Sequence, residues 1–318
     1  MKLPLDIRDL MTSGAKLRTE REKPIRIAIF VDVDAPDELV NAVQAALLPQ
    51  TSGARLHVEA CAPGEVLLVD DASDAVVAIA GPGTTLERSL ASARDRFVPT
   101  VVLVLCEPAE AVSRRLAHPL LDTHAAEDAE AVVRALGTWL ADRVSAKRLA
   151  LAANFAFVRR AVAEESVKAT AFQNGIIGTV AIIPGTDMPL MTANQAKMVL
   201  QIAAAYGETL GAERIKELAV VVGGGFAFRS VARQALAFIP GFGWAVKGAI
   251  GYSGTLAMGY AAVEYFERGG DVSGLADKLR EARDRAVEVA GRARGRLGGT
   301  RPDALPAAPA TLPEESQL

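Results

Sequence analysis

The sequence predicts a protein of the α/β class, in which a three-layer sheet domain is followed by an all-α helical domain with an apolar hairpin. Two observations support this fold class. Short apolar runs alternate with helical segments over residues 25–145, as in a sheet covered by helices. Residues 146–270 then show helical periodicity in small and apolar residues, punctuated by glycine. A chain of 318 residues and 33.4 kDa is long enough for two such domains.

Five apolar runs in the first domain have the length of strands. The run at 25–33 is rich in isoleucine and valine, which is typical of a central parallel strand. The other four runs span 55–62, 66–70, 74–81 and 99–108. Helices are expected between them, and the last helix of the domain is expected over 126–143. A flexible arm with one short helix is predicted for 1–24.

The second domain contains a long stretch that is almost free of charge. Residues 234–263 carry a single charged side chain, Lys247, between uncharged runs of 13 and 16 residues. Each run is shorter than the roughly 20 apolar residues that span a bilayer. We therefore predict a helical hairpin over 234–263, either buried in protein or dipping into a membrane. An amphipathic helix over 271–297 and a disordered tail over 298–318 complete the chain.

Small residues recur at a helical spacing within this stretch. Gly251, Thr255 and Gly259 are four residues apart, so they lie on one face of a helix. Such a stripe lets a second helix backbone approach closely. We expect these three residues to form an interface, either inside a soluble helical core or between membrane helices. Self-association is the expected result if the stripe is exposed.

Several short segments of the second half form a distinctive pattern. They are Ile183-Pro184-Gly185-Thr186-Asp187, Gln195 to Met198, Ala204-Ala205-Tyr206-Gly207, Ile239-Pro240-Gly241-Phe242-Gly243 and Tyr265-Phe266-Glu267-Arg268-Gly269. The pattern resembles an uncharacterised helical domain that is appended to many bacterial Era-like and EngA-like GTPases and also occurs in YcjF-like membrane proteins. The resemblance covers about a hundred residues. It implies a membrane association and a protein partner such as a GTPase, and it implies no chemistry.

The first domain resembles a small GTPase whose phosphate loop has degenerated. Leu39-Val40-Asn41-Ala42-Val43 is similar to the Leu-x-Asn-Ala-Leu segment that follows this loop in Era-like GTPases. A phosphate loop has the pattern G-x-x-x-x-G-K-[ST] between a strand and a helix. The alignment places Phe30 and Ala35 at the glycines, Pro36 at the lysine and Asp37 at the magnesium-binding hydroxyl. We therefore predict a pseudo-GTPase, because the cation is missing, proline has no N–H and nearby carboxylates repel phosphate.

The other nucleotide motifs of the family are absent as well. The positions of Asp-x-x-Gly and Asn-Lys-x-Asp are filled by Asp70-Asp71-Ala72-Ser73 and Cys106-Glu107-Pro108-Ala109. We expect no bound cofactor and no catalytic residue. The alternative is a metal-dependent NTPase or a receiver-like phosphoacceptor, in which Asp32, Asp34 and Asp70 bind a hard cation at strand ends. The lysine of a receiver is missing, and His118, Asp122 and His124 fall short of a zinc signature.

Composition narrows the partners and the location. A net charge of −3 and an isoelectric point near 5.8 do not indicate a nucleic-acid partner. Cys61 and Cys106 lack the spacing of a disulfide scaffold or a zinc site. The first 24 residues lack an apolar signal core, so a cytoplasmic, membrane-associated location is expected. The predicted function is a non-catalytic interaction or regulatory protein, with a fully soluble regulator as a further alternative.

Overall fold

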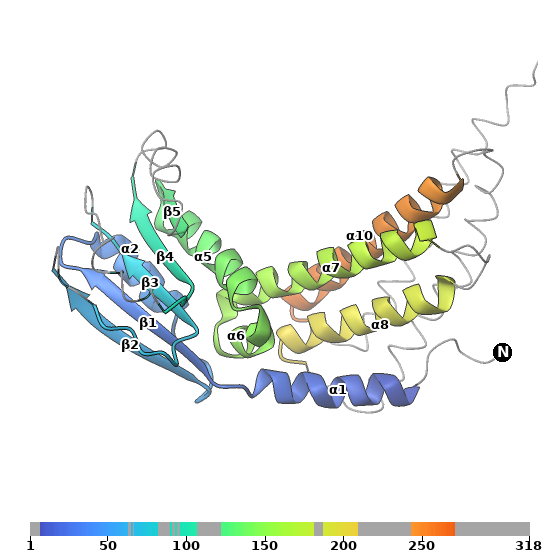
Figure 1. The fold of residues 1–318 in the computed structure, drawn as a ribbon, viewed down its shortest axis with the longest axis horizontal. Coiled ribbons are helices and arrows are strands. Elements are labelled where there is room, and N and C mark those ends of the chain that lie inside the picture. Colours follow the sequence, from blue (N-terminus) through green and yellow to red (C-terminus); the bar gives the residue numbers. More distant parts are fainter. Residues whose placement is uncertain are drawn as a thin grey trace, which may run out of the picture. The chain divides into compact units, whose positions relative to one another are not determined.

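The computed structural model describes residues 7–62, 65, 67–81, 90, 93, 96–106, 122–180, 187–208 and 243–270. Within these ranges the protein is a mixed α/β structure with one five-stranded sheet and seven α-helices (Figure 1). The α/β class predicted from the sequence is therefore confirmed. The helix predicted at 271–297 and the tail predicted at 298–318 lie outside the described residues.

The sheet is parallel throughout and follows the order β2-β1-β3-β4-β5. Its strands are β1 (Ile25–Asp32), β2 (Ala54–Cys61), β3 (Ala75–Ile79), β4 (Thr100–Leu105) and β5 (Asp122–Ala126). Every residue of the central strand β3 is buried, as expected for a strand covered on both faces. This strand order is the flavodoxin-like order of doubly wound sheets.

Two of the strand predictions need correction. Residues 67–70, inside the predicted strand 66–70, form no strand. Leu67 and Val69 are buried while Leu68 is exposed, so the segment alternates like a strand, but it crosses from β2 to β3 without joining the ladder. The fifth strand is β5 instead. Its sequence, Asp-Thr-His-Ala-Ala, is too polar to show an apolar run, so it is not among the strands predicted from the sequence.

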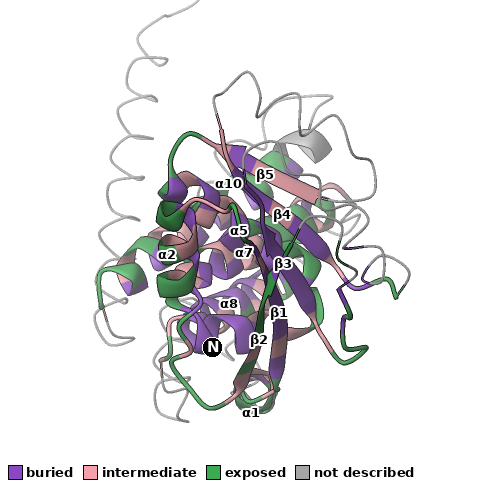
Figure 2. Ribbon diagram, turned by 90° about the vertical axis from the view of Figure 1, so that its left-hand side faces the viewer, coloured by how far each residue is buried: buried purple, intermediate pink, exposed green. Residues whose placement is uncertain are grey.

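The two faces of the sheet are covered differently. One face packs under α2 (Asp37–Ala46) and α5 (Ala129–Arg143), with a core that includes Ile27, Ile29, Leu39, Val43, Val77, Leu136 and Leu140. The other face has a core of Phe30, Leu67, Val69, Val76, Ala78 and Leu90, to which the crossing segment contributes Leu67 and Val69. Figure 2 shows that β1 and β3 are mostly buried.

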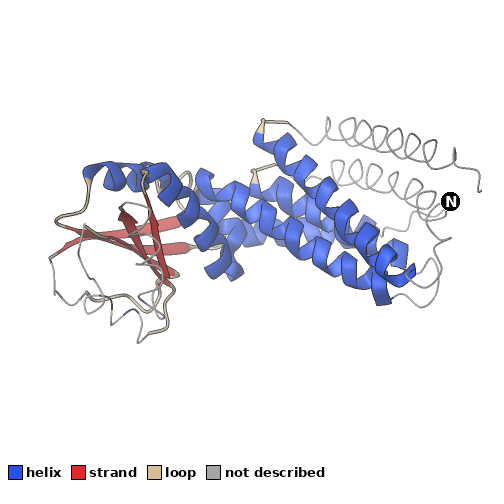
Figure 3. Cartoon of the chain, turned by 90° about the horizontal axis from the view of Figure 1, so that it is seen from above, coloured by secondary structure: helices blue, strands red, loops and turns tan. Residues whose placement is uncertain are grey.

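The remaining described helices pack against one another in a helical group. They are α1 (Ile7–Arg21), α6 (Arg148–Asn154), α7 (Arg159–Val180), α8 (Asp187–Ala205) and α10 (Gly243–Glu267). The long helix α7 packs against α8 and α10, and α1 packs against α6 and α8 (Figure 3). The segment 1–24, expected to be an arm with one short helix, therefore contributes a packed helix of 15 residues.

The amino-terminal edge of the sheet is joined to the helices by specific hydrogen bonds. Lys147 Nζ lies 2.7 Å from a carboxylate oxygen of Asp74, just before β3, and donates to the carbonyl of Pro24, just before β1, at 2.8 Å. The N–H of Gln50 donates to the carbonyl of Asn154 at 2.8 Å. One hydrophobic core also continues from the sheet into α7, α8 and α10. The amino-terminal edge is thus covered by the helices.

The small-residue stripe of α10 lies against α7 of the same chain. A Cβ atom added to Gly251 would lie 2.7 Å from the carbonyl oxygen of Asn174, and one added to Gly259 would lie 2.5 Å from Val167. Thr255 is fully buried and accepts hydrogen bonds from Asn174 Nδ2 at 3.0 Å and Gln195 Nε2 at 2.9 Å. The close helix packing expected of this stripe therefore occurs within the chain, and the stripe gives no reason to expect self-association.

The structure describes only residues 243–263 of the hairpin predicted over 234–263. Helix α10 begins at Gly243 and runs without a break through position 247 to Glu267. Residues 234–242 lie outside the described ranges, so the hairpin stays a prediction. No helix in the described part of the chain combines the length and the apolar character needed to cross a bilayer.

The close contact of α10 with α7 gives a matched pair of glycine substitutions. We expect Gly251→Ala to lower the free energy of unfolding by about 1–3 kcal/mol, because its Cβ meets backbone that cannot move freely. Gly254 has no atom within 4 Å of its added Cβ, so Gly254→Ala should raise the stability by roughly 0.5–1 kcal/mol through helix propensity. Urea denaturation measures both values. Equal effects of the two substitutions would contradict this packing.

Candidate functional site

In a doubly wound sheet, ligands bind at the carboxyl ends of the strands, where the strand order reverses. In this sheet the reversal lies between β1 and β3. Asp32 is the last residue of β1, and Gly81 follows β3 by two residues. The loop 33–36 then leads from β1 into α2. These two chain segments define the candidate site.

The Asp32 carboxylate lies inside this site rather than facing solvent. Asp32 is only 2% exposed to solvent. One oxygen, Oδ1, accepts the backbone N–H of Asp34 at 3.2 Å, and the other, Oδ2, accepts the backbone N–H of Gly81 at 3.3 Å. In a phosphate site, loop amides bind the anionic phosphate group in the same way. Here the anion is a side chain of the protein itself.

None of the four residues of the loop has a backbone N–H left for a ligand. The N–H of Val33 donates to the carbonyl of Cys61 at 3.2 Å, and that of Ala35 donates to the carbonyl of Asp32 at 3.0 Å. The Asp34 N–H bonds to the Asp32 carboxylate, and Pro36 has no N–H. A phosphate group would therefore have to break existing hydrogen bonds to gain any loop amide.

The crevice between the two strand ends is also closed sterically. A Cβ atom added to Gly81 would lie 2.7 Å from the carbonyl oxygen of Asp34 and 2.9 Å from its carbonyl carbon. The loop after β1 thus rests directly on the backbone after β3, and a residue without a side chain is needed there. This contact leaves no room for a ligand between Asp34 and Gly81.

The residues aligned with the phosphate loop are found in three settings. Phe30 is fully buried within β1, so it is a core residue of the strand. Pro36 is the N-cap of α2 and Asp37 is the first residue of that helix, while Ala35 packs against the core. The side chains of Asp34, Asp37 and Glu38 are exposed. The mouth of the site is therefore a solvated, acidic surface.

The carboxylates proposed as a metal site do not come together. Asp32 lies at the carboxyl end of β1, whereas Asp70 precedes the amino end of β3 and accepts the N–H of Ala72 at 2.9 Å. The two positions are at opposite edges of the sheet, because β1 and β3 are parallel. Among the described residues, no group of three or more His, Cys, Asp or Glu side chains is placed to hold a metal ion.

The corrected strand count also moves the motif positions. The segment after β3 is Ala80-Gly81-Pro82-Gly83, not Asp70-Asp71-Ala72-Ser73, and it too lacks the aspartate of Asp-x-x-Gly. The residues after β5 are Glu127 and Asp128, so no lysine follows that strand either. These corrections change the alignment, and the motif residues are not found at the new positions either.

The structure describes only residues 122–124 of the segment 118–124, which contains the two histidines and the aspartate considered as metal ligands. His118 lies outside the described ranges, and Asp122 and His124 are on β5. Asp122 accepts a hydrogen bond from Trp139 Nε1 at 2.7 Å and pairs with Arg143 at 2.9 Å. Both partners are on α5, so Asp122 joins this edge strand to the helix above it.

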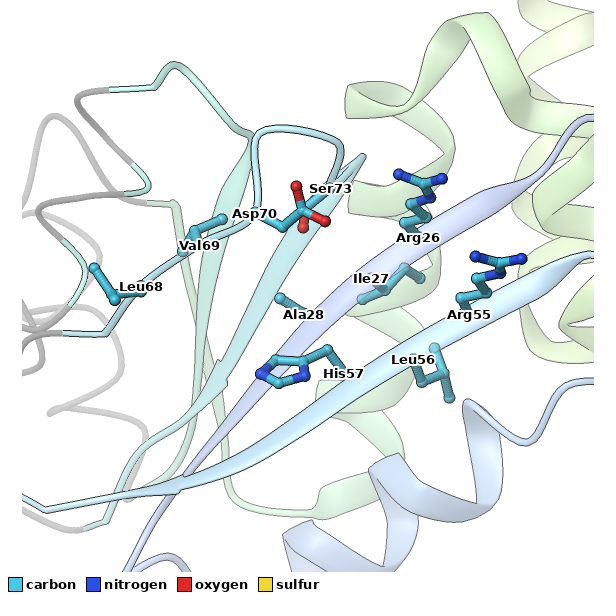
Figure 4. Close-up of a pocket in the computed structure, with 10 residues that line it drawn as sticks. All are labelled: Arg26, Ile27, Ala28, Arg55, Leu56, His57, Leu68, Val69, Asp70 and Ser73. Atoms are coloured by element: carbon cyan, nitrogen blue, oxygen red, sulfur yellow. The ribbon is translucent and has the colours of Figure 1, made fainter.

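A shallow cavity of about 570 Å³ lies on the sheet face at β1 and β2 (Figure 4). Arg26, Arg55 and His57 line it from the two strands, and Asp70 and Ser73 line it from the crossing segment. The sequence signal for this surface is the polar side chains at alternate positions of β2, Arg55 and His57, within a segment that the sequence analysis treats only as an apolar run. The cavity lies away from the carboxyl edge, so it is separate from the crevice.

Two segments that carry the family resemblance meet at the ends of α8 and α10. The rings of Tyr206 and Phe266 stack with centroids 6.3 Å apart. Arg160 pairs with Glu267 at 2.5 Å and with Glu164 at 2.9 Å beside them. Burial, reinforced by the nearby Glu267 carboxylate, raises the pKa of Tyr206 to about 12. Tyr206 is therefore part of a packed junction between helices, and its phenol is neutral.

Comparison with family models, with curated proteins and with solved structures finds no match to this chain. The resemblance to the GTPase-associated helical domain therefore stays a prediction. The interpretation of the site depends on its geometry alone.

The hydrogen bonds of Asp32 can be tested by removing its carboxylate. Asp32→Ala leaves the N–H groups of Asp34 and Gly81 without an acceptor, and we expect a loss of about 1–3 kcal/mol in the free energy of unfolding. Asp34→Ala is the matched control in the same loop. Its carboxylate is exposed, so the expected change is within about 0.5 kcal/mol. Denaturant unfolding that ranks the two variants the other way would contradict the assignment.

Proposed function

We propose that this chain is a non-catalytic interaction protein, in which a doubly wound domain keeps the architecture of a ligand-binding sheet while its own carboxylate fills the crevice. The observation that supports the proposal best is the pair of hydrogen bonds from Asp34 and Gly81 to Asp32. The chain would act through its surfaces, by binding another protein. A GTPase as that partner remains an expectation from the family resemblance.

Charge and backbone geometry both oppose nucleotide binding. A triphosphate would first have to displace the Asp32 carboxylate from two amides. It would then lie beside the exposed carboxylates of Asp34, Asp37 and Glu38, with no lysine to offset its charge. A magnesium ion would reduce this repulsion, but the Asp32 oxygens already accept backbone hydrogen bonds. We therefore favour a pseudo-enzyme over an NTPase or a phosphoacceptor.

The GTPase-like architecture predicted for 25–145 remains a more specific part of this proposal. The proposal does not require it, because the rule that ligands bind at the strand-order reversal holds for flavodoxin-like sheets as well. Either origin would leave the same closed crevice. The proposal therefore rests on the hydrogen bonds of Asp32 and not on a GTPase ancestry.

Nucleotide binding is the direct test. Isothermal titration of the full chain with GTP and with ATP, each with magnesium, should give no saturable heat up to millimolar ligand. The reason is that each loop amide is either bonded within the chain or absent. A dissociation constant in the micromolar range for either nucleotide would contradict the proposal. Tighter binding in Asp37→Ala, which removes one of the repelling carboxylates, with no change in Asp71→Ala at the opposite edge, would place that binding at the crevice.

Membrane adsorption is a second candidate function, supported by one exposed apolar patch. Phe172 and Ile176 lie one turn apart on α7 and are 64% and 47% exposed. Tyr252 on α10 packs against Gly175 between them and is 42% exposed. Aromatic and branched side chains that gather on a protein surface suit a protein or lipid interface. We propose that this patch makes the membrane contact expected from the sequence.

Flotation with vesicles that contain anionic phospholipid tests the patch. We expect the full chain to float with the vesicles, and we expect Phe172→Ser combined with Ile176→Ser to reduce the floated fraction several-fold. Phe97→Ser is the control, because Phe97 is highly exposed but lies outside the patch. A wild-type chain that stays at the bottom of the gradient would favour the fully soluble regulator.

A further inference from the structure

The edge strand β2 is unusually open. It pairs with β1 on one side, and no described strand pairs with its other side (Figure 1). Six consecutive positions, from Arg55 to Ala60, include five exposed residues, and Val58 is 61% exposed. Figure 2 shows this exposed strand beside the buried β1 and β3. An open strand with apolar residues is a template for further strand pairing.

The free backbone groups of β2 belong to alternate residues. Ile25 donates to the carbonyl of Gly53, and Val33 donates to the carbonyl of Cys61, at the two ends of the β1–β2 ladder. With a period of two along a strand, the odd-numbered residues between them also bond to β1. The N–H and C=O groups of Ala54, Leu56, Val58 and Ala60 therefore point away from β1, toward the open side.

The side chains of β2 are complementary to a second, antiparallel copy of the same strand. If His57 faces His57 of the second copy, Arg55 lies opposite Glu59 twice, once on each side of the two-fold axis. The same register places Leu56 opposite Val58 and Ala54 opposite Ala60. Both of these are pairs of even-numbered residues, whose free N–H and C=O groups can exchange hydrogen bonds. Charge, apolar contact and backbone pairing thus agree on one register.

Neighbouring registers satisfy fewer of these conditions. Shifting the second copy by two residues places Arg55 opposite either His57 or Cys61 and loses the pairing with Glu59. A shift by one residue places bonded odd-numbered groups opposite free even-numbered ones, so the ladder cannot form. Proteins protect open edges with lysine, proline or bulges, and β2 contains none of these in residues 54–61.

We propose that two copies of this chain associate through antiparallel pairing of β2, which joins two five-stranded sheets into one continuous sheet around a two-fold axis at His57. Opposite charges and branched apolar pairs across strands stabilise such an interface. The cavity lined by Arg26, Arg55 and His57 lies on the same face of β1 and β2. In the dimer, the two cavities would face the same side of the sheet and flank the axis.

Charge reversal tests this register. In light scattering coupled to size exclusion, the wild-type chain should have twice its 33.4 kDa mass at tens of micromolar. Arg55→Glu and Glu59→Arg alone should each give a monomer, because like charges then face each other across the axis. The double variant Arg55→Glu with Glu59→Arg restores opposite charges and should be a dimer again. Glu38→Arg, on the exposed side of α2, should not change the mass.

A backbone substitution provides an independent test. Val58→Pro removes an N–H that points away from β1, so it should abolish the dimer while far-UV circular dichroism and the melting temperature of the monomer are retained. A wild-type chain that is monomeric at 100 µM would overturn the proposal. A dimer whose mass is unchanged by Glu59→Arg and by Val58→Pro would overturn it too.

Discussion

The Asp32 carboxylate determines how this domain differs from a ligand-binding sheet of the same topology. A carboxylate buried at a strand end must accept hydrogen bonds, because a buried charge without partners is very costly. Asp34 and Gly81 supply them from the two segments that would otherwise form the walls of a crevice. The same two bonds therefore satisfy the charge, hold the loop after β1 against the backbone after β3, and occupy two amide donors that a phosphate could otherwise use.

The edges of the sheet then have different roles. The amino-terminal edge is covered by helices, where Lys147 and Asn154 bond to the segments that precede three strands. At the carboxyl edge, the loop after β1 rests on the backbone after β3 at Gly81. The side edge at β2 is left open, and the patch around Phe172 and Tyr252 is exposed on the helices. A chain with a closed crevice and these open surfaces is suited to assembly, which is why we favour an interaction protein over an enzyme.

The sequence predicted the elements that bury apolar residues with a clear period. The strands β1, β3 and β4 and the helix α5 were found within a few residues, because their burial leaves apolar runs or helical spacing. The sequence-based prediction was wrong where a segment is buried without pairing in the sheet, or pairs in the sheet without being apolar. Residues 67–70 alternate like a strand but cross the sheet unpaired, whereas β5 is paired but polar. Of the site, the proline at position 36 and the absence of a lysine beside it were evident from the sequence. The bonds from Asp34 and Gly81 to Asp32 were not evident. Both use backbone amides, which leave no mark in the sequence, and the bond from Gly81 joins residues that are 49 positions apart.

The most direct measurement of the central claim is the behaviour of the Gly81 and Asp34 amide protons in solution. In two-dimensional NMR of the labelled chain, both amides should be protected from hydrogen exchange, and their resonances should not move when magnesium and GTP are added. This result is expected if the Asp32 carboxylate already occupies the two donors. Rapid exchange of both amides, or a saturable shift of their resonances with nucleotide, would contradict the account.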